Sequence, residues 1–172
     1  MTSLRAILGE KLRRAERVAV LAMGSALRGD DAAGMLAGEK LAGLSAHQRA
    51  QRQVAVFLGG TAPENLTGEI KKFQPTHLII LDAADMGREP GSIEVMDVAA
   101  LSLNTSVSTH GLPVAMLADY LLRSTGCEVI VVGIQPETRG FGEEPSEKIR
   151  RAAGELATAI AAAVGLSGGT ET

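Results

Sequence analysis

The sequence has very few aromatic residues and no excess of positive charge. Aromatic residues make up 2% of the 172 residues, and tryptophan is absent. Binding of single-stranded nucleic acid by stacking on aromatic platforms is therefore excluded. The 17 basic residues are outnumbered by 20 acidic ones, giving a net charge of -3. Because no basic surface is available for phosphate contacts, we expect no nucleic-acid partner.

The chain also lacks a second cysteine and any long apolar run. Cys127 cannot form an internal disulfide, so a reducing compartment is expected. The longest apolar stretches, around 78–81 and 129–132, have strand length and are too short to cross a bilayer. Charged residues interrupt the first 17 positions, where a secretory signal needs an apolar core. We therefore expect a cytoplasmic monomer that has no contact with membranes.

Hydrophobic residues make up 45% of the sequence, enough for one core of aliphatic side chains. Segments of strand character alternate with segments of helical periodicity, which predicts right-handed crossovers and an α/β fold with helices on both faces of a parallel sheet. Residues 92–98 predict an antiparallel edge strand, so the sheet should have about five strands. The other strands are expected at 18–23, 54–58, 77–82 and 128–134, with helices near 30–44, 63–73, 113–122 and 146–164 and a loop at 104–111.

We expect a single domain at residues 18–164, flanked by two smaller segments. Residues 1–17 have helical periodicity and should form an amphipathic extension ahead of the main fold. Residues 165–172 are rich in Gly, Ser and Thr and lack an apolar pattern, so a disordered tail is expected there.

Polar residues follow the predicted strands at the edge where parallel strands end. The first strand is followed by Gly24 and by Gly29-Asp30-Asp31-x-x-Gly34, the third ends on Asp82, and the last is followed by Gly133-Ile-Gln-Pro136. Functional groups of open parallel sheets gather at this edge. The glycine spacing is similar to that of a phosphate loop, but two carboxylates would repel phosphate. They suit a cation instead.

Each candidate residue also has a purely structural interpretation. Asp30 or Asp31 is suited to cap the following helix, and Asp82 to brace a loop. His110 lies in a segment between elements that can reach the same edge. If these residues converge, two carboxylates and one imidazole form a three-ligand site with open positions, which borderline divalent ions accept. Spacing alone does not establish that convergence.

Five motifs occur in order along residues 18–164. They are Gly29-Asp30-Asp31-x-x-Gly34, Gly59-Gly60-Thr61-Ala-Pro-Glu-Asn65, Leu81-Asp82-Ala-Ala-Asp-Met-Gly87, Thr109-His110 and Gly133-Ile-Gln-Pro136. Together they resemble the hydrogenase maturation endopeptidases, in particular the members that serve hydrogenase 3 and their archaeal relatives. The resemblance implies a three-layer α/β/α sandwich. It also implies removal of a C-terminal extension from the nickel-iron hydrogenase large-subunit precursor after nickel insertion.

By this resemblance, Asp31, Asp82 and His110 match the metal ligands of the family. Nickel is the expected metal and is presented by the precursor, while zinc or cadmium is expected to occupy the site in isolated protein. Two departures are visible, since the N-terminal segment is longer than usual and Ser25 stands where the family usually has Asn. A serine hydroxyl can still make a turn-stabilising hydrogen bond.

By the same resemblance, the hydrogenase large-subunit precursor is the expected partner of this chain. Its binding is expected to involve the loop after the second strand and the last motif, at Gly59, Gly60, Thr61 and Gln135.

No nucleophile arrangement is recognisable, since Cys127 lies beside a buried strand and no serine elbow motif is present. His47, in a polar loop, and His77, before a buried strand, are expected to be bystanders. A metal at the site should polarise the scissile carbonyl or lower the pKa of a bound water, with Asp30 as the candidate base. Two alternatives stay open: a non-catalytic checkpoint that binds the nickel-loaded precursor, and a nucleotide-binding module.

Overall fold

The computed structural model describes residues 1–98, 101 and 113–167 of the chain. Within these residues, one sheet contains β1 (Val18–Met23), β2 (Val54–Gly60), β3 (His77–Ala83), β4 (Ile93–Asp97) and β5 (Glu128–Ile134). The strand order is β2-β1-β3-β5-β4. All neighbours are parallel except β4, which pairs with β5 in the antiparallel direction. The predicted sheet and its antiparallel edge strand are confirmed.

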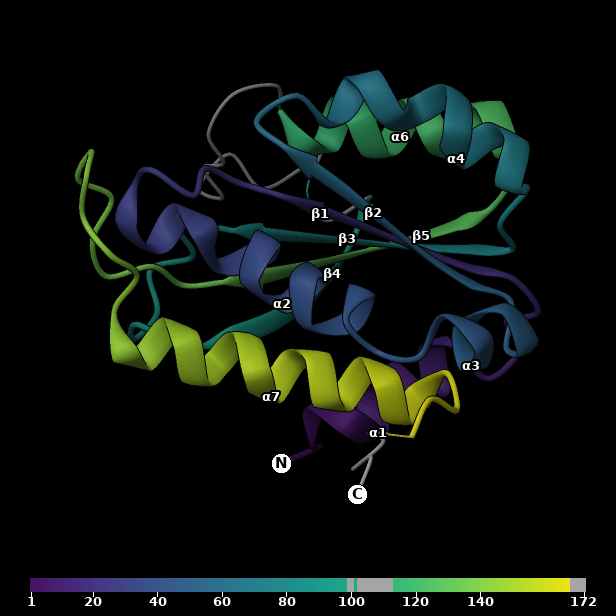
Figure 1. Ribbon diagram of the computed structural model, residues 1–172, viewed down its shortest axis with the longest axis horizontal. Helices are drawn as coiled ribbons and strands as arrows, with labels where there is room; N and C mark the ends of the chain where they lie inside the picture. Colours follow the sequence, from purple (N-terminus) through teal and green to yellow (C-terminus); the bar gives the residue numbers. More distant parts are fainter. Residues whose placement is uncertain (99–100, 102–112, 168–172) are drawn as a thin grey trace.

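Helices cover both faces of the sheet, so the expected three-layer α/β/α sandwich is also confirmed (Figure 1). Short 3-10 turns at Gly29–Ala32 and Pro63–Leu66 precede two of the helices. None of the helices in the described part of the chain is long and apolar enough to cross a membrane. One side carries α1 (Leu4–Lys11), α2 (Ala33–Ala42), α3 (Ala46–Gln51) and α7 (Glu147–Ala163), and the other carries α4 (Thr67–Phe73) and α6 (Val114–Thr125).

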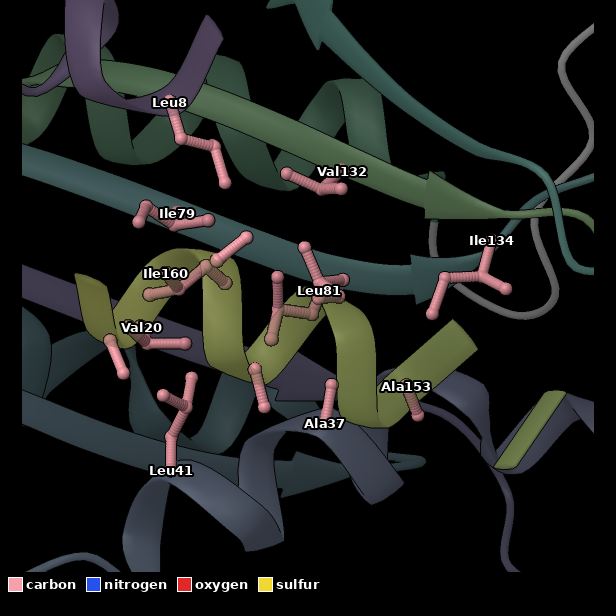
Figure 2. Close-up of a cluster of buried hydrophobic side chains, with 14 of the residues drawn as sticks. Leu8, Val20, Ala37, Leu41, Ile79, Leu81, Val132, Ile134, Ala153 and Ile160 are labelled. Atoms are coloured by element: carbon pink, nitrogen blue, oxygen red, sulfur yellow. The ribbon is translucent and has the colours of Figure 1, made fainter. Parts of the chain in front are cut away.

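Two aliphatic cores hold the three layers together. Figure 2 shows the first, where Val20, Ile79 and Val132 of the sheet pack with Leu8 of α1 and Ile160 of α7. Successive side chains of a strand point to opposite faces, so the next residues along the same strands enter the second core. Full burial of one such side chain contributes about 1.5–3 kcal/mol. The second core contains Leu21, Ile70, Ile80, Leu117 and Leu121.

The N-terminal segment is helical as predicted, but it is not an extension ahead of the fold. Leu8 of α1 is fully buried in the first core, and Leu12 is nearly so. Lys11 Nζ lies 2.7 Å from Asp97 Oδ1, which ties α1 to the edge strand β4. Residues 1–17 are therefore packed against the same core as the rest of the domain.

The predicted tail also differs from the structure over residues 165–167. Leu166 is 4% exposed and belongs to the first core, and its amide donates a hydrogen bond to the carbonyl of Ala161. Ser167 Oγ lies 3.3 Å from Gln48 Oε1. A single Leu among Gly, Ser and Thr residues is enough to dock this segment. The remaining residues of the predicted tail, 168–172, lie outside the described part of the chain.

Two further differences concern loops. His47 was expected in a polar loop, but it lies in the short helix α3, where the Gln48 amide donates a hydrogen bond to the side chain of the N-cap residue Ser45. The helix is polar and contributes no buried residue, so hydrophobic periodicity could not reveal it. The loop predicted at 104–111 lies outside the described residues.

Candidate active site

The described candidate residues lie at the carboxyl edge of the sheet, where the parallel strands end. Asp82 in β3 is opposite Gly133 of β5, and Met23 of β1 is opposite Gly60 of β2. From β1 the chain crosses outward to β2, and from β2 it returns to β3 on the other side of β1. The edge between β1 and β3 is therefore a topological switch point, the place where open α/β sheets bind their ligands.

Two glycines allow the loop after β1 to lie against the strand ends. A Cβ atom on Gly34 would overlap the carbonyl oxygen of Leu81, one residue before Asp82. Gly24 has a φ of 137°, and a Cβ atom there would overlap the carbonyl oxygen of Asp31. Since any side chain would push these segments apart, the glycines of the motif are what bring Asp31 to the strand that carries Asp82.

Asp31 and Asp82 are two almost completely buried carboxylates, with exposures of 4% and 6%. Burial raises the pKa of Asp82 well above its ordinary value, and the negative charge of Asp31 raises it further. The Ala83 amide and the charge of Arg139 oppose this rise without cancelling it. Asp82 Oδ2 is buried and has no hydrogen-bond partner within the described ranges. Two such carboxylates form an oxygen donor set that fits a cation.

Arg139 is a site residue that the sequence analysis did not identify. Its Nε lies 3.7 Å from Asp31 Oδ1, and its side chain is 24% exposed. The residue lies three positions after Pro136, in the segment that follows β5 at the carboxyl edge. The sequence does contain a signal for Arg139. It is a basic residue shortly after the end of a strand, at the edge where acidic residues also follow the strands.

Neither Asp30 nor Asp31 is the N-cap residue of the following helix, so the structural role considered for one of them is not found there. The N-cap residues of the 3-10 turn and of α2 are Arg28 and Ala32, and neither makes a side-chain cap bond. Instead, the carboxylate of Asp30 accepts hydrogen bonds from the segment between β5 and α7, which runs beside the loop after β1 (Figure 1). The donors are the amides of Glu137 (2.7 Å), Thr138 (3.0 Å) and Ser146 (2.7 Å) and the hydroxyl of Ser146 (3.0 Å).

These hydrogen bonds also decide the protonation of Asp30. Its complete burial by itself would raise the pKa of Asp30. The bonds from Ser146, Thr138 and Glu137 outweigh that effect, and the net pKa is lowered. A carboxylate that is stabilised in its charged form and engaged through both oxygens is a poor proton acceptor.

Gln135 is buried at the start of the same segment. Its Oε1 accepts hydrogen bonds from the amides of Met86 (2.7 Å) and Arg88 (3.2 Å), and its Nε2 lies 3.3 Å from Asp85 Oδ1. The bond from Gln135 is the main cause of the lowered pKa of Asp85. The side chain therefore braces the loop after β3, and its expected contact with substrate stays a prediction.

The two glycines that end β2, Gly59 and Gly60, lie at the same edge as the carboxylates. A Cβ atom on Gly59 would come within 2.9 Å of Pro63, so the loop can only turn this tightly with glycine. Gly60 has a φ of 55°, and its carbonyl accepts a hydrogen bond from the Gly24 amide at 2.9 Å. Thr61 is exposed. This loop is available at the edge, while its predicted role in substrate binding stays untested.

Ser25 makes the turn-stabilising bond that the sequence analysis anticipated. The Leu27 amide lies 3.3 Å from Ser25 Oγ and donates to it.

The third predicted ligand, His110, lies outside the described residues. Within the described part of the chain, no group of three or more His, Cys, Asp or Glu residues could hold a metal ion, so the geometry describes only the Asp31 and Asp82 side of the predicted set. His47 is exposed on α3, and His77 begins β3 at the opposite edge of the sheet. Burial raises the pKa of the Cys127 thiol, which is consistent with an inert buried side chain.

Comparison with known proteins identifies the class to which this site belongs. The model of the HycI family, hydrogenase maturation protease, matches residues 39–163. The chain belongs to the hydrogenase maturation protease family, as the five ordered motifs predicted. Membership in a protease family disfavours the nucleotide-binding alternative.

Particular relatives place the chain near the proteases of hydrogenase 3. It is 38% identical to the hydrogenase 3 maturation protease of Escherichia coli K12 over 133 residues, which cover 77% of this chain and 81% of that protein. The crystal structure of the nickel-iron hydrogenase maturation protease HycI from Thermococcus kodakarensis matches with a TM-score of 0.83 at 34% identity, covering 92% of this chain and 99% of that one. The E. coli maturating endopeptidase HybD matches with a TM-score of 0.67 at 26% identity, covering 86% and 91%.

Proposed function

We propose that the chain is an endopeptidase that removes the C-terminal extension of a nickel-iron hydrogenase large-subunit precursor after nickel insertion. The observation that carries this proposal is the pair of buried carboxylates, Asp31 and Asp82, at the switch point of a hydrogenase maturation protease fold. Asp82 Oδ2 is buried and has no hydrogen-bond partner among the described residues, which supports a role for this oxygen in binding a ligand.

In this proposal, Asp31, Asp82 and His110 recognise the nickel that the precursor carries. Buried carboxylates repel each other, so a cation between them recovers the free energy lost on desolvation. Zinc or cadmium can substitute in the isolated protein, because both accept carboxylate and imidazole ligands. A metal held at this position polarises a scissile carbonyl or activates a water molecule.

The protein residues around the site position its parts. We assign Asp30 to holding the segment between β5 and α7 beside the site, in place of the base role expected for it, because both of its oxygens already accept hydrogen bonds. Gln135 holds the loop after β3 in the same way. The water-excluding position of Asp31 and Asp82 strengthens their interaction with charge, since the local dielectric constant is low.

The experiment that tests the proposal compares two forms of one substrate. Purified protein is incubated with nickel-loaded and nickel-free precursor, and the large subunit is measured by mass spectrometry. Shortening of the loaded precursor alone is expected. Equal cleavage of both forms would contradict recognition of nickel, and stable binding without any cleavage would favour the non-catalytic checkpoint.

A further inference from the structure

Arg139 brings a positive charge to the carboxylate pair from the chain itself. Its Nε lies 3.7 Å from Asp31 Oδ1, and both Nε and Nη2 are buried atoms. The charge of the same guanidinium also acts on Asp82, at the end of β3. One cation therefore acts on the acidic groups at the ends of both β1 and β3.

The position of Arg139 is fixed by its own segment. The preceding residue, Thr138, donates its amide to Asp30 Oδ2 and accepts the Asp30 amide at 2.8 Å. Gly29 lies so close to the Thr138 carbonyl that a Cβ atom would come within 3.0 Å of it. The backbone beside Arg139 is thus clamped to the loop that carries Asp31. Its charge is built into the site, unlike that of a lysine or arginine on the free surface.

The charges in this site are incompatible with simultaneous occupancy by Arg139 and a divalent ion. Among the described residues at the pair, Asp31 and Asp82 supply at most two negative charges in a buried environment, and Arg139 forms an ion pair with Asp31. A divalent ion at the pair would face a guanidinium that cannot lose its proton. Binding of the ion therefore requires Arg139 to move away from Asp31.

We propose that Arg139 is an internal counter-ion that weakens the binding of free divalent ions at the site and is displaced more readily by the metal that the precursor presents. This inference rests on the proposed recognition of nickel by Asp31 and Asp82. The precursor can supply the free energy needed to displace Arg139, because its contacts outside the metal contribute binding free energy that a free ion lacks. The side chain has a path to solvent, since 24% of its surface is exposed.

The test is a calorimetric titration of Zn²⁺ into the metal-free full-length protein and its variants. Arg139→Gln removes the charge and is expected to bind Zn²⁺ about tenfold more tightly than wild type, or more. Arg139→Lys keeps the charge and should remain within about threefold of wild type. Arg123→Gln is the matched control, because Arg123 also pairs with an aspartate, at 3.0 Å, but on the surface of α6. Thermal unfolding of each variant checks that the fold is kept.

Three results would overturn the inference: unchanged Zn²⁺ affinity in Arg139→Gln, weaker affinity in that variant, or equal tightening in Arg139→Gln and Arg139→Lys. The first two would mean that Arg139 only supports the loop or orients Asp31, and the third that its shape rather than its charge limits binding. The proposed function is judged separately, by whether the wild-type protein cleaves nickel-loaded precursor. A wild-type enzyme that cleaves normally while Arg139→Gln binds Zn²⁺ no better would refute the counter-ion alone.

Discussion

The buried polar groups at the two edges of the sheet differ in how completely they are hydrogen-bonded. At the amino edge, where the parallel strands begin, the buried ring of His77 lies 3.0 Å from Thr76 Oγ1 and 3.3 Å from Glu128 Oε2. The Thr76 hydroxyl also accepts the amides of Glu16 and Arg17 and donates to the carbonyl of Arg17. These polar groups are satisfied by neighbours in the chain.

At the carboxyl edge, Asp30 and Gln135 are hydrogen-bonded in the same way, but the burial of Asp82 is not matched by such bonding. Asp82 Oδ2 has no hydrogen-bond partner in the described residues, and the charge of Asp31 makes the ionised form of Asp82 still less favourable. Leaving a buried acceptor unsatisfied costs about 1–3 kcal/mol. The bonded polar groups at the amino edge therefore stabilise the fold. At the carboxyl edge, Asp82 lowers the stability and leaves an oxygen for a cation.

Breaking the carboxylate pair should have the largest effect. Asp31→Asn and Asp82→Asn are each expected to lower the rate of precursor processing by at least about 100-fold, because each removes a charged ligand from a shared site. His110→Ala should act in the same way. The measurement is the initial rate of formation of the shortened large subunit, with circular dichroism to confirm folding.

The control for these variants is Asp119→Asn, which removes an exposed carboxylate of α6 that pairs with Arg123. It should process precursor at the wild-type rate. Retention of normal processing in any of the three ligand variants would refute the three-ligand site.

A variant of Asp30 tests whether a carboxylate at the carboxyl edge can stabilise the fold. Asp30→Asn replaces an oxygen acceptor by a donor facing other donors, so it should lower the free energy of unfolding by about 2–3 kcal/mol. Processing should fall as well, because the segment that carries Arg139 loses its anchor. Urea unfolding gives the first quantity. A variant with wild-type stability but no activity would return Asp30 to the role of catalytic base.

The amino edge should show the reverse pattern. Thr76→Val keeps the side-chain volume but removes the hydroxyl shared by Glu16 and Arg17, and it should cost about 1–2 kcal/mol of unfolding free energy. Processing by the folded variant should not change, since Thr76 lies at the opposite edge from Asp82. Reduced activity at a temperature well below the unfolding midpoint would show that the two edges are coupled.

Much of the fold could be predicted from the sequence, because buried parallel strands contain uninterrupted apolar runs, such as residues 78–81 of β3. The close approach at Gly34, where a Cβ atom would overlap the Leu81 carbonyl, was not predicted from the glycine spacing. α3 could not be predicted from apolar runs, since it contributes no residue to the core. The docking of Leu166 depends on one side chain, which no periodicity can record.

The site was predictable only in part, for a related reason. Asp31 and Asp82 follow strands, so topology alone brings them to one edge. The different roles of Asp30 and Asp31 could not be predicted, because the two residues are identical and adjacent in the sequence. Asp30 turns to the segment between β5 and α7, over a sequence separation of more than 100 residues. Arg139 reaches Asp31 across a similar separation, which makes it invisible to local patterns.

The pH dependence of the unfolding free energy measures the cost of ionising Asp82 in the folded protein. Its folded-state pKa is raised above the ordinary value of 3.8, so the folded protein binds more protons than the unfolded chain just above that pH. Stability therefore falls as pH rises from about 4 through the raised pKa, by about 1.4 kcal/mol for each pH unit within that range. Asp82→Asn lacks this loss.

The measurable quantity is the unfolding free energy of Asp82→Asn minus that of wild type, in the presence of chelator. The difference should increase over this pH range and then become constant. Any fixed packing cost of the amide cancels from the slope. A difference that does not vary with pH would mean that Asp82 is ionised in the folded state without strain.

The smallest effect is expected from truncation near the amino edge, where residues around Val18 and Arg52 adjoin Gly165. A chain ending at Val164 loses the buried Leu166, and one ending at Ser167 keeps it. Burial of a leucine contributes about 1.5–3 kcal/mol, and ordering a terminal residue opposes it by about 1–2 kcal/mol, so the shorter chain should be less stable by about 1 kcal/mol. Both chains should process precursor at the wild-type rate, because neither truncation reaches the carboxyl edge. Equal unfolding midpoints in urea would show that the docked leucine adds nothing to stability, while lost processing in the shorter chain alone would extend the functional site to the amino edge.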